Sequence, residues 1–532
     1  MCGILAVIGT DLEVALIQSL SKRLKHRGPD ESDFVALVDS GVLMHERLSI
    51  VDLNAGKQPI QGTSNAWMIH NGEIYNHKSI RENVLAHHTF RTQSDSEVIV
   101  HLYEEFGPEC CDLLDGIFAF VVLDGTEVFV GRDPLGVKPL YWGKDKMGRL
   151  YFASELKAIV DQCPQFEAFP PGHYYTKKTG LVRYYKPQWF DPTAAATALD
   201  SEAIRNVLTK AVQKRLMGDV PIGVLLSGGL DSSLIASIAS RLTRENSSSP
   251  LKSYAVSLDP SAPDAVAARE VAAFLKTDHR EIHFTIEEGL QILDKLIWHL
   301  ETYDVTSIRA STPMFFLSKA IAADGVKVVL SGEGSDEIFG GYMYFRNAPS
   351  EAAFHLETID RLQKLATADL LRADKSTMAH GVEARVPFLD KEFLELSVAV
   401  APEHKMPSTH DGIEKYILRN AFDLPADPYL PEGILWRQKE QFSDGVGYSW
   451  IDSLVAYCES QIADSLFSQA TTLFPHNTPL TKEAFYYRQR FQKHFPGQAA
   501  AQTVLKWIPK WQKNTDPSGR ANKAHAKPDL AF

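Results

Sequence analysis

Cys2 is the first residue of the 532-residue sequence whose type and position suggest catalysis. Once Met1 is removed, Cys2 carries both a thiol and a free α-amine, so one residue supplies a nucleophile and a base. An α-amine has a pKa of about 8 and can accept a proton near neutral pH. The alternative is an incidental buried cysteine. The context Met1-Cys2-Gly3-Ile4 favours the catalytic interpretation.

Two loops rich in glycine and serine each follow a short apolar run. The first is SGGLDSS at 227–233, and the second is SGEGSDE at 331–337. Glycines let backbone N–H groups surround an anion, and the N-terminus of a following helix adds a favourable dipole. The first loop therefore predicts a phosphate cradle, although it lacks the Walker A pattern. A tight strand-to-helix turn with a serine cap is the simpler alternative.

Short motifs also follow one another in a fixed order through the first 186 residues. They are MCGI at 1–4, HRGPD at 26–30, RLSIV at 47–51, NGEIYN at 71–76, SDSE at 94–97, DG at 115–116 and GRDPLG at 131–136. This series resembles the class II glutamine amidotransferase domain. The resemblance implies an α+β N-terminal nucleophile fold, an αββα sandwich, in which Cys2 attacks the side-chain amide of glutamine.

The same resemblance implies which residues bind glutamine. Arg47 suits the carboxylate because its planar guanidinium can donate two parallel hydrogen bonds. Asp95 and Glu73 would hold the ammonium group. The Asn71 side-chain amide and the Gly72 backbone N–H would form an oxyanion hole, where one donor contributes roughly 3–4 kcal/mol. An Asn-Gly pair is equally typical of a hairpin turn. The rest of the glutamine-binding set is Leu48, Ser49, Ile50 and Val51.

A second series of motifs resembles the synthetase domain of glutamine-hydrolysing asparagine synthetases. Besides the loop 331–337, it comprises YDVT at 303–306, RASTPM at 309–314, DLLRADK at 369–375, GVEARVPFLD at 381–390 and WRQKEQFSDGVG at 436–447. The loop 227–233 resembles the pyrophosphate-binding loop of ATP pyrophosphatases, which cleave ATP between its α and β phosphates. Together the resemblances reach to about residue 510.

This second resemblance implies sites for ATP, Mg²⁺ and aspartate. The ATP-binding residues would be Leu226, Ser227, Gly228, Gly229, Asp231, Ser232, Val256, Ser331 and Gly332. Asp231 and Asp336 would share one Mg²⁺, because clustered acids repel each other unless a cation lies between them.

Three further side chains are implied at the aspartate site. They are Glu333, Asp369 and Arg372. Glu333, needed for forming the acyl-adenylate, and Lys439, a counter-charge for phosphate, would be catalytic. Asp369 and Arg372 are also spaced for a helical i, i+3 salt bridge, which remains an alternative.

The elements that position these residues differ between the two halves. In the first half, apolar runs predict strands at 2–8, 66–75, 117–123, 128–130 and 150–153, and helical spacing predicts helices at 12–24 and 95–106. In the second half, strands at 222–226, 253–258 and 326–330 alternate with helices at about 232–242 and 264–275. This alternation predicts an α/β parallel sheet with helices on both faces, whose ligands bind at the carboxyl ends of its strands. From residue 349 the chain is predicted to be largely helical.

Composition limits which partners the protein can bind and which cellular compartment it occupies. The formal net charge is -12, which argues against a nucleic-acid partner. The five cysteines form no Cys-x-x-Cys pair and indicate a reducing compartment, so we expect a cytoplasmic protein. No apolar run approaches the ~20 residues of a membrane helix. Family resemblance adds a homodimer to these expectations.

We therefore predict a glutaminase domain (1–186), a linker (187–200), a synthetase domain (201–510) and a flexible basic tail (511–532). The expected reaction is ATP-dependent synthesis of asparagine from aspartate through β-aspartyl-AMP, with ammonia released from glutamine. One alternative is an amide or lactam synthetase of the same scaffold that acts on another carboxylate. A second is a binding or regulatory homologue without catalysis.

Overall fold

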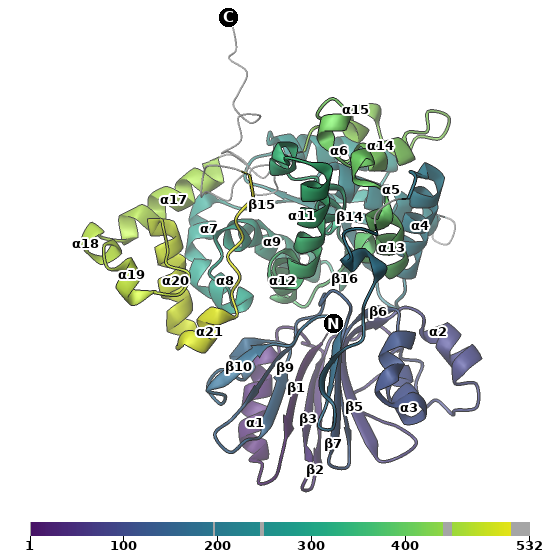
Figure 1. The fold of residues 1–532 in the computed structure, drawn as a ribbon, viewed down its shortest axis with the longest axis vertical. Helices are drawn as coiled ribbons and strands as arrows, with labels where there is room; N and C mark the ends of the chain where they lie inside the picture. Colours follow the sequence, from purple (N-terminus) through teal and green to yellow (C-terminus); the bar gives the residue numbers. More distant parts are fainter. Residues whose placement is uncertain (1, 195–196, 245–248, 440–448, 512–532) are drawn as a thin grey trace, which may run out of the picture.

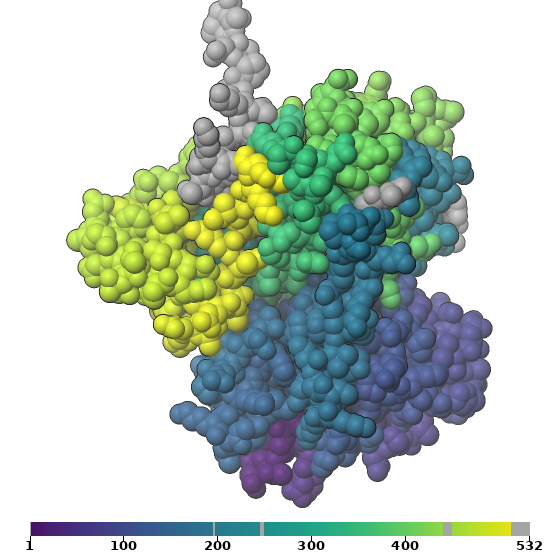
Figure 2. Space-filling view, viewed as in Figure 1, coloured from purple at the N-terminus to yellow at the C-terminus, as the bar shows by residue number. Residues whose placement is uncertain are grey.

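The computed structural model describes residues 2–194, 197–244, 249–439 and 449–511. Two parts lie one above the other in Figure 1, an N-terminal part built mainly of strands and a larger C-terminal part with many helices. Figure 2 shows the two parts in direct contact, with the segment that joins them running up the front of the molecule. The predicted tail lies outside the described residues from 512 onward.

Two six-stranded antiparallel sheets make up the N-terminal part. One has the strand order β10-β8-β9-β1-β3-β2, and the other has the order β12-β11-β7-β6-β5-β4. The strands are β1 (Gly3–Ile8), β2 (Glu31–Leu37), β3 (Gly41–Arg47), β4 (Ile60–Gln61), β5 (Ala66–Ile74), β6 (Gly116–Asp124), β7 (Glu127–Arg132), β8 (Tyr141–Lys144), β9 (Leu150–Ala153), β10 (Gln165–Ala168), β11 (His173–Thr176) and β12 (Gly180–Arg183).

Side-chain alternation along these strands builds four layers. Ile4 and Ala6 of β1 pack between the sheets against residues of β5, β6 and β7, while Leu5 and Val7 face outward onto α1 (Val14–Ser21). On the other sheet, Phe118 and its outward-facing neighbours pack against α3 (Glu97–Phe106). The predicted αββα sandwich is confirmed. Both helices begin two residues later than the apolar spacing predicts.

A five-stranded parallel sheet organises the C-terminal part. Its order is β15-β14-β13-β16-β17. The strands are β13 (Ile222–Leu225), β14 (Lys252–Ser257), β15 (Asp278–His283), β16 (Val328–Leu330) and β17 (Glu383–Arg385). The sequence analysis missed β15 and β17, because β15 is polar and half-exposed and β17 has only three residues. The predicted parallel sheet is confirmed.

Helices cover both faces of this sheet. Val224, Ala255 and Leu330 pack with the helices that flank β13, while Tyr254 and Val329 pack on the opposite face. The larger helices are α4 (Ser201–Lys214), α5 (Leu230–Arg244), α6 (Pro263–Leu275), α8 (Leu293–Leu300), α9 (Val305–Ala323), α11 (Glu351–Lys364), α12 (Asp369–Met378), α13 (Lys391–Ala399), α17 (Ser449–Gln461) and α20 (Lys482–His494). The shorter ones are α7 (Ile286–Gln291), α10 (Ser335–Phe339), α14 (Tyr416–Phe422), α15 (Glu432–Leu435), α18 (Asp464–Phe467), α19 (Ala470–Leu473) and α21 (Gln498–Gln502). The short helix α2 (His77–Ser79) belongs to the N-terminal part. Apart from β17, the part after residue 349 is mainly helical, as predicted.

Buried charges join the two parts. The Arg27 guanidinium, in the loop after α1, lies 2.8 Å from carboxylates of both Glu155 and Asp374, and Asp374 belongs to α12 of the C-terminal part. Leu48 and Ile50 pack beside them against Val328 and Met378. A buried charge is costly unless it is paired, so these contacts fix how one part sits on the other.

Candidate active site

Cys2 directly precedes β1 and is buried. Its backbone N–H donates to Asn71 Oδ1 at 2.8 Å, and its thiol Sγ lies 3.9 Å from the Leu48 carbonyl oxygen. Burial raises the pKa of the Cys2 thiol, and the positive charge of Arg47 opposes part of that rise. The thiol is therefore protonated at rest, and a base must remove its proton before it can attack.

The Asn71-Gly72 pair stands opposite Cys2 within β5, so the hairpin-turn alternative is wrong. Asn71 is 0% exposed, and within the described residues its Nδ2 has no hydrogen-bond partner. Gly72 has a φ of 143°, and a Cβ on it would lie 1.9 Å from the Ile117 carbonyl oxygen. A buried amide donor without an acceptor is costly, so this Nδ2 is ready to bind an oxygen atom supplied by a ligand.

Arg47, at the end of β3, is already bound to a carboxylate of the chain. Its Nη1 donates to Glu31 Oε2 at 2.8 Å and its Nη2 to the Asp52 carbonyl oxygen at 2.7 Å. A small hollow beside it is also lined by Lys57 and Gln58. The sequence did not indicate the Glu31–Arg47 contact.

Glu73 and Asp95 form a buried acidic pair near the same site. Asp95 accepts the Ile74 backbone N–H at 2.7 Å, and burial raises its pKa to about 6. Burial together with the charges of Glu383 and Asp95 raises the pKa of Glu73 well above its usual value. The Arg385 guanidinium of β17 lies 3.3 Å from Glu73 Oε1, while Oε2 has no hydrogen-bond partner within the described residues.

The loop Leu48–Val51 lies against the C-terminal part. The Ser49 backbone N–H donates to Asp30 Oδ2 at 2.7 Å, and Lys327 Nζ lies 2.7 Å from the same oxygen. The predicted glutamine-binding loop is thereby held by both halves of the molecule. The predicted residues Cys2, Leu48 and Asn71 meet, and Arg47 acts on Cys2 through its charge.

The second centre begins at the carboxyl end of β13. Ser227 and Ser232 bind each other through their hydroxyl oxygens at 2.9 Å, which closes the loop that leads into α5. Gly228 has a φ of 73°, and a Cβ there would lie 2.5 Å from the Ala268 backbone nitrogen. A Cβ on Gly332, in the loop after β16, would lie 2.8 Å from the Ser232 backbone nitrogen. The two glycine-rich loops are therefore in contact, as the parallel sheet predicts.

Two aspartates from these loops converge on one lysine. Lys415 Nζ lies 2.5 Å from Asp231 Oδ2 and 2.6 Å from Asp336 Oδ1. Lys439 Nζ lies 2.9 Å from the other oxygen of Asp336. Burial raises the pKa of Asp336, but the two lysines outweigh it and hold that pKa down at about 2. The predicted convergence of Asp231 and Asp336 is present, with a cation between them as the clustered acids require.

Glu333 lies across the same cavity with Arg372 and Asp369. Arg372 Nη2 is 2.9 Å from Glu333 Oε2 and 3.3 Å from Asp369 Oδ1. The helical salt bridge considered for Asp369 and Arg372 is thus present, and both side chains also face the cavity. Burial raises the pKa of Glu333, and the charge of Arg372 opposes that rise.

These side chains line a cavity of about 190 Å³ at the carboxyl edge of the sheet. Of the predicted set, the lining includes Leu226, Ser227, Gly229, Asp231, Ser232, Val256, Ser331, Gly332, Glu333, Asp336, Asp369, Arg372 and Lys439. Residues 440–447 of the predicted motif that contains Lys439 lie outside the described residues. Segments that are distant in sequence thus meet at the carboxyl ends of the parallel strands, where ligands bind in such sheets.

Among the lining residues that the sequence analysis did not assign to the site are Tyr342, Lys415, Arg437 and Trp507. Lys415 has a left-handed backbone with a φ of 58°, and only the fold shows it between the two aspartates. Arg437 donates to the Gly228 carbonyl oxygen at 3.1 Å, and its position next to Lys439 in a matching motif was the one available signal. Trp507 arrives from the last described segment, far away in sequence.

A direct path connects the two centres. Arg385 contacts Glu73 through its side chain, while its backbone carbonyl accepts the Ser331 N–H at 2.9 Å. Ser331 lines the cavity of the second centre. One three-residue strand, β17, therefore touches both centres.

Comparison with known proteins gives matches to both halves. Residues 1–191 match the family model described as glutamine amidotransferase domain, and residues 203–357 and 346–515 match the one described as asparagine synthase. The chain is 52% identical over 550 residues to asparagine synthetase [glutamine-hydrolyzing] 3 of Arabidopsis thaliana, covering 98% of this chain and 94% of the relative. It is 50% identical over 554 residues to a probable asparagine synthetase [glutamine-hydrolyzing] of Dictyostelium discoideum, covering 99% of each. A probable asparagine synthetase [glutamine-hydrolyzing] of Schizosaccharomyces pombe is 52% identical over 556 residues, again with 99% of each chain covered.

Proposed function

The chain belongs to the glutamine-hydrolysing asparagine synthetases, and we propose that it makes asparagine from aspartate and ATP with ammonia released from glutamine. The products are asparagine, AMP, pyrophosphate and glutamate. The observation that carries this proposal for the first centre is Asn71 Nδ2, which has no hydrogen-bond partner within the described residues and belongs to a side chain that binds the buried Cys2 at position 2.

In the first half-reaction, the Cys2 sulfur adds to the side-chain carbonyl carbon of glutamine. After removal of Met1, the α-amine of Cys2 takes the thiol proton and passes it to the leaving ammonia. Asn71 Nδ2 and the Gly72 N–H stabilise the negative charge that develops on oxygen, and Asn71 Oδ1 holds the Cys2 nitrogen in place. Water then cleaves the thioester and releases glutamate.

The two charged groups of glutamine, its α-carboxylate and its α-ammonium, are each bound by side chains of opposite charge. Arg47 binds the carboxylate, for which the Glu31 carboxylate now at its guanidinium is a chemical stand-in. Glu73 and Asp95 are the buried acids that attract the ammonium group. Burial raises the pKa of both, and the positive charge of the bound ammonium favours their ionised forms. The loop of Leu48, Ser49, Ile50 and Val51 forms the wall next to the C-terminal part.

In the second half-reaction, the β-carboxylate of aspartate attacks the α-phosphorus of ATP, and pyrophosphate leaves. Ammonia then attacks the acyl carbon of β-aspartyl-AMP and displaces AMP. Lys439 and Lys415 place positive charge at the loop that receives the phosphates. Glu333 and Arg372 lie in the same cavity and orient aspartate, whose carboxylate suits Arg372 and whose ammonium suits Asp369.

Asp231 and Asp336 fit a Mg²⁺ ion that arrives with ATP. Their carboxylates converge from two loops onto one cationic position, which Lys415 serves in this structure. Magnesium prefers such oxygen ligands, usually one or two carboxylates together with phosphate oxygens. When bound, it neutralises charge on the pyrophosphate leaving group.

The proposed division is a glutaminase domain at 1–186, a linker at 187–200, a synthetase domain at 201–510 and a tail at 511–532. The linker packs closely, because Trp189 is buried and Thr197 pairs with Val400. Ammonia must cross from Cys2 to the cavity before water protonates it, and the buried contacts of β17 support a sheltered route.

Cytoplasmic location and homodimer formation complete the proposal. All five cysteines are buried free thiols, which suits a reducing compartment. Within the described ranges, none of the helices has the length and apolar character needed to cross a bilayer. Sedimentation of the purified chain tests the dimer.

The deciding experiment supplies purified protein, with Met1 removal verified by mass, with ATP, Mg²⁺ and aspartate. Nitrogen comes either from amide-labelled glutamine or from ammonium. We expect labelled asparagine together with equal amounts of AMP and pyrophosphate. AMP without asparagine would mean that another carboxylate is the substrate, and no AMP from folded protein would refute the enzymatic function.

A further inference from the structure

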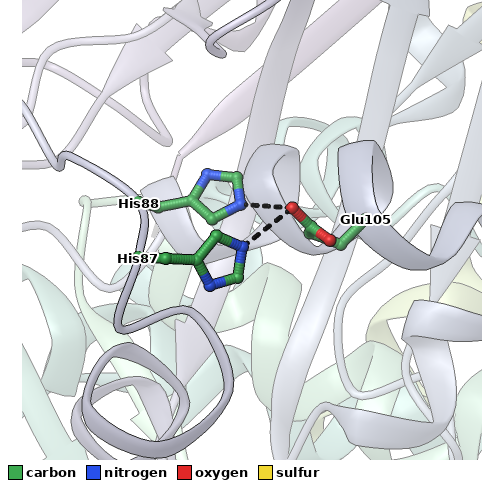
Figure 3. A group of neighbouring side chains, drawn as sticks. All are labelled: His87, His88 and Glu105. Carbon is green, nitrogen blue, oxygen red and sulfur yellow. Dashed lines mark hydrogen bonds and ion pairs between the residues drawn. The ribbon is translucent and has the colours of Figure 1, made fainter.

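A cluster of histidine and glutamate side chains lies on the N-terminal sandwich, outside both centres. His87 and His88 lie in the loop after the π-helix η2 (Ile80–Val84), and Glu105 lies in the last turn of α3 (Figure 3). The Nε2 atoms of His87 and His88 lie 3.0 and 2.8 Å from the same Glu105 carboxylate oxygen. The three ligand atoms all lie within 4.8 Å of one another. The proposed reaction uses none of these residues.

The loop that carries the two histidines is anchored on both sides. On one side Leu85 is fully buried, and its carbonyl accepts the His88 backbone N–H at 2.9 Å. On the other side the Phe90 ring packs edge-on against His101 at 5.1 Å and lies under the Arg81 guanidinium at 4.1 Å. The histidine pair is therefore held close to α3 in advance of any ligand, which lowers the entropic cost of binding.

A neighbouring triad of His88, His101 and Glu104 is less suited to a ligand. Glu104 already accepts the backbone N–H groups of Thr63 and Ser64 at 3.1 and 2.6 Å, and it binds His101 Nδ1 at 3.0 Å. By contrast, within the part of the chain that the structure describes, the hydrogen bonds of the Glu105 carboxylate run to His87 and His88. Glu105 can change partners at little cost to the fold.

We propose that His87, His88 and Glu105 bind a divalent transition-metal ion of the Zn²⁺ type. Two imidazole nitrogens with one carboxylate oxygen suit zinc, copper or nickel, whereas magnesium prefers oxygen ligands alone. Three protein ligands leave a fourth tetrahedral position for water. The His87 side chain is 65% exposed and that of Glu105 is 38% exposed, so an ion reaches the site directly from solvent.

Metal binding requires only small movements of the three side chains. Zinc lies about 2 Å from its nitrogen and oxygen ligands, so the ligand atoms move slightly farther apart than they are in the present hydrogen bonds. The exposed His87 ring can make that adjustment, while His88 stays packed against the His101 ring at 4.8 Å. The metal then takes the place of the shared hydrogen bonds to Glu105.

Binding would tie the loop to the end of α3 and so act on stability. The start of α3 is tied to the same chain segment, because Glu97 accepts the backbone N–H groups of Arg91 and Thr92 at 2.8 Å each. The segment from His87 to Glu97 would thus be bound to both ends of α3, through Glu97 at its start and through the metal and Glu105 at its end. We expect a higher melting temperature of the N-terminal part on metal binding.

The test is isothermal titration of the full chain with ZnCl₂ after removal of metals by a chelator. The titration is done in a Cys2→Ala background, so that the catalytic thiol cannot compete for zinc. Visible absorption of added Co²⁺ reports nitrogen and oxygen ligation independently. We expect one equivalent of zinc and a rise in melting temperature.

Three variants decide where the ion binds. His88→Ala and Glu105→Gln should each weaken zinc binding about tenfold or more, since even indirect supporting partners contribute that much. The matched control His476→Ala removes an exposed histidine elsewhere and should bind as the parent does. Glu105→Gln can still accept from the imidazoles, so it stays informative if His88→Ala fails to fold. Absence of zinc binding, or unchanged affinity in both site variants, would overturn the proposal.

Discussion

The donors proposed for the oxyanion next to Cys2 are neutral N–H groups, whereas the cavity at Asp231 brings acidic and basic side chains into direct contact. The Asn71 amide and the Gly72 backbone belong to one strand of a rigid sandwich. The groups at Asp231 come from loops that are far apart in sequence, and Lys415 and Lys439 neutralise the aspartates there.

The difference follows from the charge that each centre must handle. Attack on an amide develops one negative charge on one oxygen, and fixed dipoles stabilise it without reorganisation. A triphosphate brings several charges at once, so its site needs cations that are themselves balanced when no substrate is bound. The predictions below test whether the two centres are chemically separate in this way, and they run from the largest expected effect to the smallest.

Cys2→Ala should separate the two centres completely. Because the nucleophile is lost, glutamine-dependent asparagine synthesis should fall about 10⁴-fold or more, while ammonium-dependent synthesis continues. Both routes are measured with the same labelled-nitrogen assay. The matched control Cys163→Ala removes a buried core cysteine and should retain both routes. Equal loss of the two routes in Cys2→Ala would show that the centres are not separable.

Lys439→Met should produce the opposite pattern. It removes a cation that pairs with Asp336 at 2.9 Å and faces the phosphate loop. Synthesis from either nitrogen source should fall about 10³-fold, the loss expected for a strong electrostatic donor, while glutamine hydrolysis continues. Glutamate release and AMP formation are measured side by side. Lys364→Met, at the exposed end of α11, is the control and should leave both unchanged. Normal AMP formation in Lys439→Met would contradict its proposed role.

The sequence predicted the parts of the fold that depend on local patterns. The apolar runs of β1 and β5 and the strand-loop-helix pattern at 222–242 predicted the strands and the helix that lie next to or carry Cys2, Asn71 and Asp231. Parallel strands end at one edge, so the meeting of the two glycine-rich loops followed from topology alone.

The remaining features depend on contacts between distant segments. The polar strand β15 has no apolar alternation to reveal it, and β17 is too short for any periodicity. Lys415 between two aspartates and Glu31 on Arg47 are consequences of packing that one sequence does not encode locally. Trp507 reaches the cavity from the end of the described chain for the same reason.

Asn71→Ala should reduce glutamine hydrolysis about 10²–10³-fold, because one oxyanion donor is lost. The effect should fall on kcat, since Asn71 Nδ2 binds an oxygen whose charge appears only in the transition state. Synthesis from ammonium should stay near the parent rate. Asn83→Ala, which changes an exposed asparagine within η2, serves as the control. A change confined to KM would show that Asn71 only positions glutamine.

Acid should affect the two centres at different pH values. Burial raises the pKa of Asp95 to about 6, whereas Lys415 and Lys439 overcome burial and hold the pKa of Asp336 at about 2. As the pH falls below about 6, Asp95 takes up a proton and loses the charge that attracts the ammonium group of glutamine. Below that pH, titration of Asp95 should therefore lower the kcat/KM for glutamine hydrolysis by up to about a further tenfold per pH unit, in addition to the loss from protonation of the Cys2 α-amine.

The comparison reaction is aspartate-dependent ATP–pyrophosphate exchange, which needs no ammonia and so avoids the titration of ammonium. Asp336 stays charged down to pH 5, so its own titration should cause no loss of exchange near pH 6. The Asp95→Asn variant should hydrolyse glutamine more slowly at neutral pH, and its rate should lack the further loss near pH 6. If that loss persisted, the titrating group would be Glu73, the second buried acid. Glu73 rather than Asp95 would then supply the charge that attracts the ammonium group of glutamine.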